Sequence, residues 1–315
     1  MFGWTGKLIV IDLSKGECHK ETLLEDYYYQ WIGGQGLNIA VQAGKLPGWE
    51  RLAGDIVSIA AGPLVGSPVM GENVWSLDGL HPFNGQLTSV YGTGNWGAVL
   101  KFTGWDQVIL WKTARKPCYI ILYENGCDIK EYQENQGTAA FFKIMKRNFG
   151  DEAEALVSTD TGIVTSSGLV SADSEARFLL ERRNVKAVIV QGKKGLPLAK
   201  PKDVLAQSSQ IVKRWKETGL SNGSNGCAVC HGHCERLMLS RESTVQNAAL
   251  NLWLATGSCP QWISSGLGQS VEELCSLLEC VTGWSCTPVE LWAGAHRIEE
   301  AKQMINERIR RPILS

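Results

Sequence analysis

Cysteines are the residues with the clearest capacity for chemistry in this chain, which holds ten of them in 315 residues. Cys227, Cys230 and Cys234 follow one another at intervals of three and four positions. This spacing allows three thiolates to converge on one side of a tight loop, and Gly226 and Gly232 supply the backbone freedom that such a loop needs. Because a [4Fe–4S] cluster is held by four thiolates, the trio predicts an iron–sulfur site with a fourth ligand elsewhere in the chain.

Four later cysteines are candidates for that fourth ligand. Cys259 lies in the segment Thr-Gly-Ser-Cys-Pro, just past the end of an expected helix, where a loop thiolate can turn inward. Cys275 and Cys280 stand among leucines at helical spacing, which is more typical of small core residues. The sequence therefore favours Cys259 and keeps Cys275, Cys280 and Cys286 as alternatives.

Zinc is the competing metal, because His231 or His233 would complete a site of three cysteines and one histidine. A third interpretation leaves the thiols buried and without a metal. The spacing of the trio favours the iron–sulfur site over both. No Ser/His/Asp or Cys/His arrangement for nucleophilic catalysis can be argued from spacing, so no catalytic residue is predicted.

Composition and charge indicate the cellular compartment and exclude some classes of binding partner. The chain carries 31 Lys and Arg against 32 Asp and Glu, with a net charge of −1. This balance argues against nucleic acid or an anionic membrane surface as the main partner. No apolar segment reaches the length of a membrane-spanning helix, and the first residues alternate like a strand rather than a secretory signal. We therefore expect a cytoplasmic protein, in which cysteines more often serve metal or redox chemistry than disulfides.

The elements that must position these residues differ between the two parts of the chain. Apolar patterns predict strands at 7–13, 55–60, 107–111, 119–123 and 185–190, and a turn at Asn125-Gly126 into a further strand. Helices are expected after the glycine-rich segment 33–36 and near 137–149. That segment matches no nucleotide-binding fingerprint, so we expect it to be the turn into a helix rather than a phosphate site.

From about residue 202 the pattern becomes helical. Helices are expected at 202–218, 241–255, 270–281 and 287–310, with Asp203 and Thr287 as N-caps of the first and the last. The sequence thus predicts an α+β protein. A β-rich N-terminal domain would span residues 1–197, and a small helical, cysteine-rich domain would span residues 198–315.

Several segments match one family in order along the chain. They include Trp31–Leu37 (WIGGQGL), Ala61–Pro68 (AGPLVGSP), Gly92–Gly97 (GTGNWG), Lys101–Asp106 (KFTGWD) and Val281–Trp284 (VTGW). The sequence resembles the tungsten-dependent aldehyde:ferredoxin oxidoreductases, whose corresponding segments include Y-L-G-G-R-G-L, T-G-P-L-T-G-T-P and V-T-G-W. The cysteine trio has that family's cluster spacing, and Gly257-Ser258-Cys259 best matches the segment with its fourth cluster cysteine.

The resemblance implies a fold and two cofactors. A β-rich N-terminal domain would form the base for a bis-pterin cofactor of tungsten or, occasionally, molybdenum. Helical domains would enclose the metal beside a [4Fe–4S] cluster that carries electrons to ferredoxin. By the same resemblance, the residues matching cluster ligands are Cys227, Cys230, Cys234 and Cys259. Those matching pterin contacts are Asn95 and Gly97.

The chain departs from the family where the pterin and the catalytic residues belong. Only 24 residues separate Cys234 from Cys259, whereas the family places most of its helical domains and its catalytic glutamate and histidine between the corresponding cysteines. Val74 replaces a family arginine. Phe178 and Leu179 stand where the family has glycines that bring backbone amides to the pterin phosphates. The sequence therefore predicts that the bis-pterin is absent.

These observations together predict a non-catalytic iron–sulfur subunit that transfers electrons or acts as a scaffold in a larger redox complex. The expected partners are a full-length subunit resembling aldehyde:ferredoxin oxidoreductase, a ferredoxin-like electron carrier, or both. One alternative is a reduced tungsten- or molybdenum-pterin oxidoreductase acting on an aldehyde or a carboxylic acid. The other is an interaction module without a cofactor.

Overall fold

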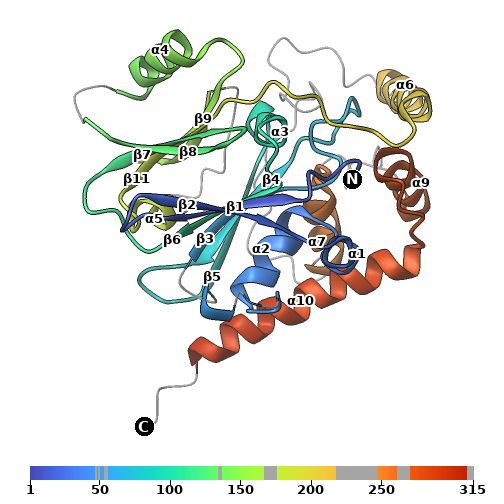
Figure 1. Cartoon of the computed structure of the whole chain (residues 1–315). Helices are drawn as coiled ribbons and strands as arrows, with labels where there is room; N and C mark the ends of the chain where they lie inside the picture. Colours follow the sequence, from blue (N-terminus) through green and yellow to red (C-terminus); the bar gives the residue numbers. More distant parts are fainter. Residues whose placement is uncertain are drawn as a thin grey trace.

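Two mixed β-sheets form the centre of the protein, and helices cover the outer faces (Figure 1). The computed structural model describes residues 1–46, 48, 50–52, 56–133, 137–166, 176–217, 247–260 and 270–310. The six-stranded sheet has the order β2-β1-β6-β3-β4-β5, and the five-stranded sheet has the order β10-β9-β11-β7-β8.

The six-stranded sheet pairs β1 with β6 in parallel and all its other neighbours antiparallel. Its strands are β1 (Lys7–Asp12), β2 (Glu17–Thr22), β3 (Ile56–Ala61), β4 (Trp75–Leu80), β5 (Leu87–Gly92) and β6 (Gln107–Trp111). Every residue of β3 is buried, because this strand lies inside the sheet and both of its faces are covered. The edge strand β2 is polar and largely exposed.

The five-stranded sheet pairs β11 with β7 in parallel, and its remaining neighbours are antiparallel. Its strands are β7 (Cys118–Tyr123), β8 (Gly126–Glu131), β9 (Glu154–Thr159), β10 (Gly162–Thr165) and β11 (Val185–Val190). Helix α3 (Asn95–Phe102) contacts both sheets, and the Trp96 indole nitrogen donates a hydrogen bond to the carbonyl of Val188 at 3.0 Å. One apolar core therefore joins the facing sides of the two sheets.

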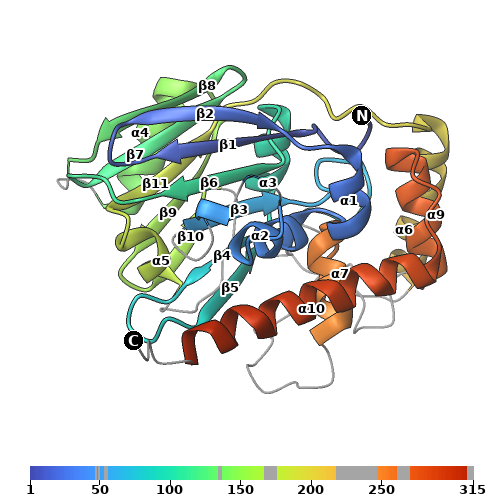
Figure 2. The same ribbon diagram turned by 60° about the horizontal axis from the view of Figure 1, so that its bottom comes forward.

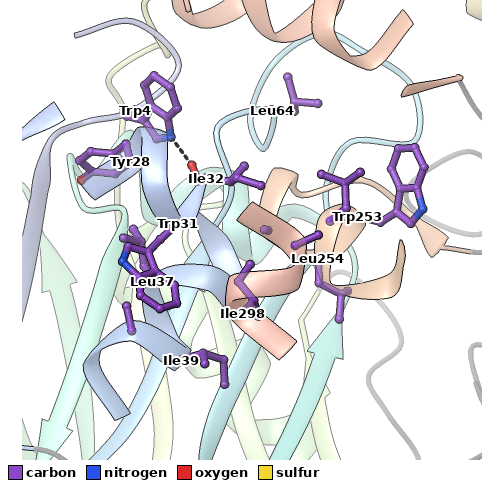
Figure 3. Close-up of a cluster of buried hydrophobic side chains, with 14 of the residues drawn as sticks. Trp4, Tyr28, Trp31, Ile32, Leu37, Ile39, Leu64, Trp253, Leu254 and Ile298 are labelled. Carbon is purple, nitrogen blue, oxygen red and sulfur yellow. Dashed lines mark hydrogen bonds between the residues drawn. The ribbon is translucent and has the colours of Figure 1, made fainter. Parts of the chain in front are cut away.

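The other face of the six-stranded sheet is covered by helices from both ends of the chain (Figure 2). These are α1 (Glu25–Trp31), α2 (Gly34–Gln42), α7 (Asn247–Thr256) and α10 (Pro288–Arg310). Their side chains form one cluster in which Ile32 and Leu37 lie close to Leu254 and Ile298 (Figure 3). The Trp4 indole donates a hydrogen bond to the Ile32 carbonyl at 2.8 Å and anchors the N-terminal segment to this cluster.

The remaining helices lie at the periphery. α6 (Pro201–Glu217) packs against α9 (Val271–Thr282), and α4 (Thr138–Phe149) covers the outer side of the five-stranded sheet. Two short helical segments, η1 (Glu50–Leu52) and α5 (Arg177–Glu181), complete the described elements. Within the described ranges, no helix combines the length and the apolar character needed to cross a membrane.

The structure confirms a β-rich N-terminal part followed by helices, and the predicted strands lie within two residues of their observed positions. Asp203 is not the N-cap of α6, because the helix already begins at Pro201 and Asp203 lies in its first turn. Thr287 is confirmed as a cap: its Oγ1 accepts from the Glu290 amide, and its own amide donates to the Glu290 carboxylate at 2.7 Å. The boundary between 1–197 and 198–315 stays a prediction, as does the cysteine-rich character of a separate helical domain.

Candidate functional site

Cys259 is the one member of the predicted cluster set that falls within the described structure; Cys227, Cys230 and Cys234 lie outside the described residues. Its side chain is buried, with 1% of its surface exposed. It follows α7, whose last residue is Thr256, after a turn in which Gly257 has φ +94°. An L side chain rarely adopts this backbone conformation, so glycine is what lets the chain turn inward here.

Backbone hydrogen bonds hold the Cys259 loop against the segment that joins β3 to β4. The carbonyl of Thr256 accepts from the Leu64 amide at 3.1 Å, and the carbonyl of Gly257 accepts from the Val74 amide at 3.0 Å. The Cys259 amide donates to the Gly71 carbonyl at 2.9 Å. These three hydrogen bonds fix the backbone from Thr256 to Cys259, on the N-terminal side of the thiol, which favours a preorganised ligand.

Close approach at this site depends on glycines. A Cβ on Gly62 would lie 2.3 Å from the Thr256 carbonyl group, and a Cβ on Gly257 would lie 2.3 Å from Cγ2 of Val65. A Cβ on Gly34, at the start of α2, would lie 2.4 Å from the Leu254 carbonyl oxygen. The segment 33–36 is therefore a tight helix entry, as predicted, and it packs against α7, the helix that directly precedes the Cys259 loop.

Beneath the loop lies a buried carboxyl group that the sequence alone did not reveal. The Ser258 hydroxyl donates to Glu72 Oε2 at 2.5 Å and lies 3.0 Å from the Thr256 hydroxyl. Burial raises the pKa of Glu72 to about 8, and the hydrogen bond from Ser258 only partly opposes this. Glu72 is therefore largely protonated at neutral pH. No spacing in the sequence links residues 72 and 258, so only the fold brings them together.

The alternative fourth ligands occupy a different environment, near α6 and α9. The thiols of Cys275 and Cys286 are hydrogen-bonded to each other. The Cys280 sulfur accepts from the Gln207 side-chain amide at 3.3 Å. Burial raises the pKa of the Cys275 and Cys280 thiols, and both residues pack in the apolar core, as their helical spacing predicts.

In the segments that the resemblance assigns to pterin binding, the protein's own side chains occupy the space beside the backbone. A Cβ on Gly97 would lie 3.0 Å from Trp75 Cδ1, so the indole of Trp75 covers this glycine. Leu179 is buried, and its Cδ2 would lie 3.2 Å from a Cβ on Gly79. The Phe178 ring packs edge-on against Phe83, with centroids 5.1 Å apart. Asn95 is exposed at the start of α3. These described residues do not form an open cradle for a pterin.

A second polar cluster lies between α2, β4, α7 and α10. The Lys302 ammonium donates to Gln35 Oε1 at 2.8 Å and to the side-chain oxygen of Asn251. Asn38 donates to Asp78 Oδ2 at 2.7 Å. Burial lowers the pKa of Lys302 to about 8 although the Asp78 carboxylate favours its charged form. No sequence signal pointed to this cluster, because the strand that carries Asp78 was not predicted and its partners come from other elements.

Comparison with known proteins decides the family. A family model for the N-terminal domain of aldehyde ferredoxin oxidoreductase matches residues 8–192, which is more than half of the chain. The chain belongs to the aldehyde ferredoxin oxidoreductase family. The resemblance found in its sequence motifs is thereby confirmed, and the two sheets described above are the family's N-terminal fold.

Relatives within the aldehyde ferredoxin oxidoreductase family are distant and longer. The tungsten-containing aldehyde ferredoxin oxidoreductases of Pyrococcus abyssi and Pyrococcus furiosus are 22% and 25% identical over 71% of this chain and 39% of their own length. The aliphatic sulfonate oxidoreductase WOR-like subunit of Pyrococcus furiosus is 23% identical over 69% of this chain and 39% of its length. The chain thus spans about two fifths of these relatives.

A solved structure with the same fold is the active-site complex BamBC of benzoyl coenzyme A reductase bound to 1,5-dienoyl-CoA. The superposition covers 72% of this chain and 37% of the other chain, with a TM-score of 0.60 and 20% sequence identity. This likeness shows that the fold is shared.

Proposed function

We propose that this protein is a non-catalytic iron–sulfur subunit of a cytoplasmic redox complex, with one [4Fe–4S] cluster held by Cys227, Cys230, Cys234 and Cys259. A bound cluster would supply one-electron transfer. The observation that carries the proposal is the fixed and buried position of Cys259, with backbone hydrogen bonds that join residues 256–259 to Leu64, Gly71 and Val74. Such a thiol needs no rearrangement of the backbone to act as a ligand.

The position of α6 supports the gathering of the other three cysteines near Cys259. The Ser208 hydroxyl of α6 donates to the Pro68 carbonyl at 2.7 Å. Pro68 belongs to the same β3–β4 segment that holds Cys259 through Gly71. The helix that precedes the trio in the sequence and the loop that contains Cys259 are therefore anchored on one segment. The 12 residues between Cys234 and α7 can reach across about 40 Å when extended, so chain length does not prevent convergence.

The non-catalytic part of the proposal rests on the filled pterin segments. The Trp75 indole against Gly97, the Leu179 side chain against Gly79 and the aromatic contact of Phe178 leave the described N-terminal domain closed at these places. The match to the relative from Pyrococcus furiosus spans only 39% of the relative's length, so that protein has room for further domains. The 24 residues between Cys234 and Cys259 are too few to hold comparable domains in this chain. We therefore assign this chain to electron transfer or scaffolding rather than to substrate chemistry.

The proposed partners are a full-length subunit of the aldehyde ferredoxin oxidoreductase family, a ferredoxin-like carrier, or both. Support comes from the names of two similar proteins, a WOR-like subunit and the BamBC complex, which describe parts of assemblies. A subunit without its own reaction chamber would need such a partner to donate or accept electrons.

One observation favours the alternative of a reduced tungsten- or molybdenum-pterin enzyme. The buried Trp75 indole nitrogen has no acceptor among the described residues, and its ring lies against Gly92 and Gly97. An orphaned donor in this place would be satisfied by a ligand atom. Because the indole is sealed by its neighbours, we rank this function second.

A metal inventory of the anaerobically isolated protein, together with any co-purifying subunits, separates these functions. The proposal predicts about four iron atoms and four sulfides per chain, with neither tungsten nor molybdenum in this subunit. Zinc without iron would contradict the cluster. Tungsten or molybdenum near one atom per chain would establish the alternative enzyme, and a metal-free protein that resists reconstitution would indicate an interaction module.

A further inference from the structure

Two cysteines outside the proposed cluster lie together where the edges of the two sheets meet. Cys18 is on β2, the edge strand of the six-stranded sheet, and Cys127 is on β8, the edge strand of the five-stranded sheet. Figure 2 shows these strands side by side, and they are in contact. They belong to separate sheets, so side chains rather than a hydrogen-bonded ladder make this junction.

The two thiols are close enough to react with each other. They are hydrogen-bonded, and the Cys18 sulfur lies 3.5 Å from the position that a Cβ would take on Gly126, next to Cys127. Both side chains pack against the core between the sheets and remain partly exposed. Cys18 is partly buried, whereas the other residues of β2 are exposed to solvent.

The groups around Cys127 raise the pKa of its thiol. Burial raises the pKa of the Cys127 thiol, and the neighbouring Cys18 and Asp128 raise it further. The Tyr123 hydroxyl, which donates to Asp128 at 3.2 Å, faces the same pair. The proton is therefore held firmly on Cys127, so we assign the attack on an outside oxidant to the other thiol of the pair, Cys18.

We propose that Cys18 and Cys127 form a reversible disulfide that links the two sheets in response to a low-molecular-weight disulfide oxidant. The Cys18 thiolate attacks one sulfur of the oxidant, which breaks the oxidant's S–S bond and releases one small thiolate. Cys127 then loses its proton to that base or to water, and its sulfur displaces the second small thiolate from Cys18. Two protein thiols are oxidised, and one small disulfide is reduced to two thiols.

The link has a structural consequence that can be measured. It would close a loop of about 110 residues, and a crosslink of that span restricts the unfolded chain strongly. We expect the oxidised protein to unfold at a temperature about 5 °C higher than the reduced protein. Neither Cys18 nor Cys127 is a ligand of the proposed cluster, so the disulfide can form whether or not a cluster is bound.

The test is anaerobic incubation of the full-length protein with oxidised glutathione, followed by alkylation, peptide mapping and thermal unfolding. We expect a Cys18–Cys127 crosslinked peptide, reversal by dithiothreitol, and the rise in unfolding temperature. Cys127→Ser should trap glutathione on Cys18, whereas Cys18→Ser should leave Cys127 largely unmodified. Cys280→Ser, a control away from the junction, should crosslink like the wild type.

Three results would overturn the inference. One is that oxidised glutathione leaves both thiols of the folded protein free to be alkylated, although it oxidises them in the unfolded protein. Another is separate glutathione adducts on Cys18 and Cys127 in the wild type without a crosslink. The third is a crosslink of either residue to a different cysteine. If the serine variants unfold at the temperature of the reduced wild type, their loss of the crosslink reports chemistry and not misfolding.

Discussion

At the scale of single residues, the Cys259 loop depends on the absence of one methyl group. Gly62→Ala would place a Cβ 2.3 Å from the Thr256 carbonyl group, and backbone atoms cannot move aside as the end of a side chain can. We expect this variant to lose about 3 kcal/mol of unfolding free energy and to bind less iron after reconstitution. Gly195→Ala is the matched control, because a Cβ there meets no atom within 4 Å. Equal stability of the two variants would contradict the described packing.

The buried carboxyl of Glu72 gives a second prediction at this scale. The folded protein keeps its proton up to a pH of about 8, whereas the unfolded chain releases it near 4.5. Between these values the unfolded state binds fewer protons, so this group lowers stability as pH rises. Chemical denaturation at pH 5 and pH 7.5 measures the unfolding free energy. From the lower to the higher pH, the wild type should lose about 3 kcal/mol more of it than Glu72→Gln does.

A surface variant separates the effect of Glu72 from general charge changes. Glu21→Gln removes a carboxylate that is exposed on β2. It should follow the pH dependence of the wild type. If Glu72→Gln did the same, the carboxyl would not be held protonated in the folded state.

At the scale of elements, Lys302 joins α10 to α2 and α7. Lys302→Met would leave the side-chain oxygens of Gln35 and Asn251 without their donor and Asp78 without a nearby cation. Because breaking one partner of a buried polar network leaves the others unsatisfied, we expect a loss of about 3 kcal/mol. Urea denaturation measures it, with the exposed Glu307→Met on the same helix as control. A change in Lys302→Met no larger than in the control would show that this network does not hold the helices.

The elements also show what the sequence could and could not predict. β3 and β11 are apolar except for Ser58 and Lys186, and their burial follows directly from that pattern. β4 was not predicted, because its sequence Trp-Ser-Leu-Asp-Gly-Leu places a charged residue and a glycine inside a strand. Asp78 is tolerated there since Asn38 and Lys302 approach it from other elements. Such contacts between distant segments leave no local signal.

At the scale of the whole molecule, the family could be predicted from motifs, while the roles of their glycines came from the fold. The segments 33–36 and 61–68 converge on α7 and on the Cys259 loop. Cys259 was predicted through its match to a family segment, yet the contacts that fix it come from Leu64, Gly71 and Val74, nearly two hundred positions earlier in the chain. Spacing alone could not have identified them.

The central claim is that Cys259 is a ligand of a [4Fe–4S] cluster in this chain. Electron paramagnetic resonance of the dithionite-reduced protein, with iron counted on the same samples, tests it most directly. The claim predicts the signal of a reduced cluster in the wild type and in Cys280→Ser, and a loss of at least about half of the iron and of that signal in Cys259→Ser. An unchanged signal in Cys259→Ser, or a wild type with no cluster signal after anaerobic reconstitution, would contradict the claim.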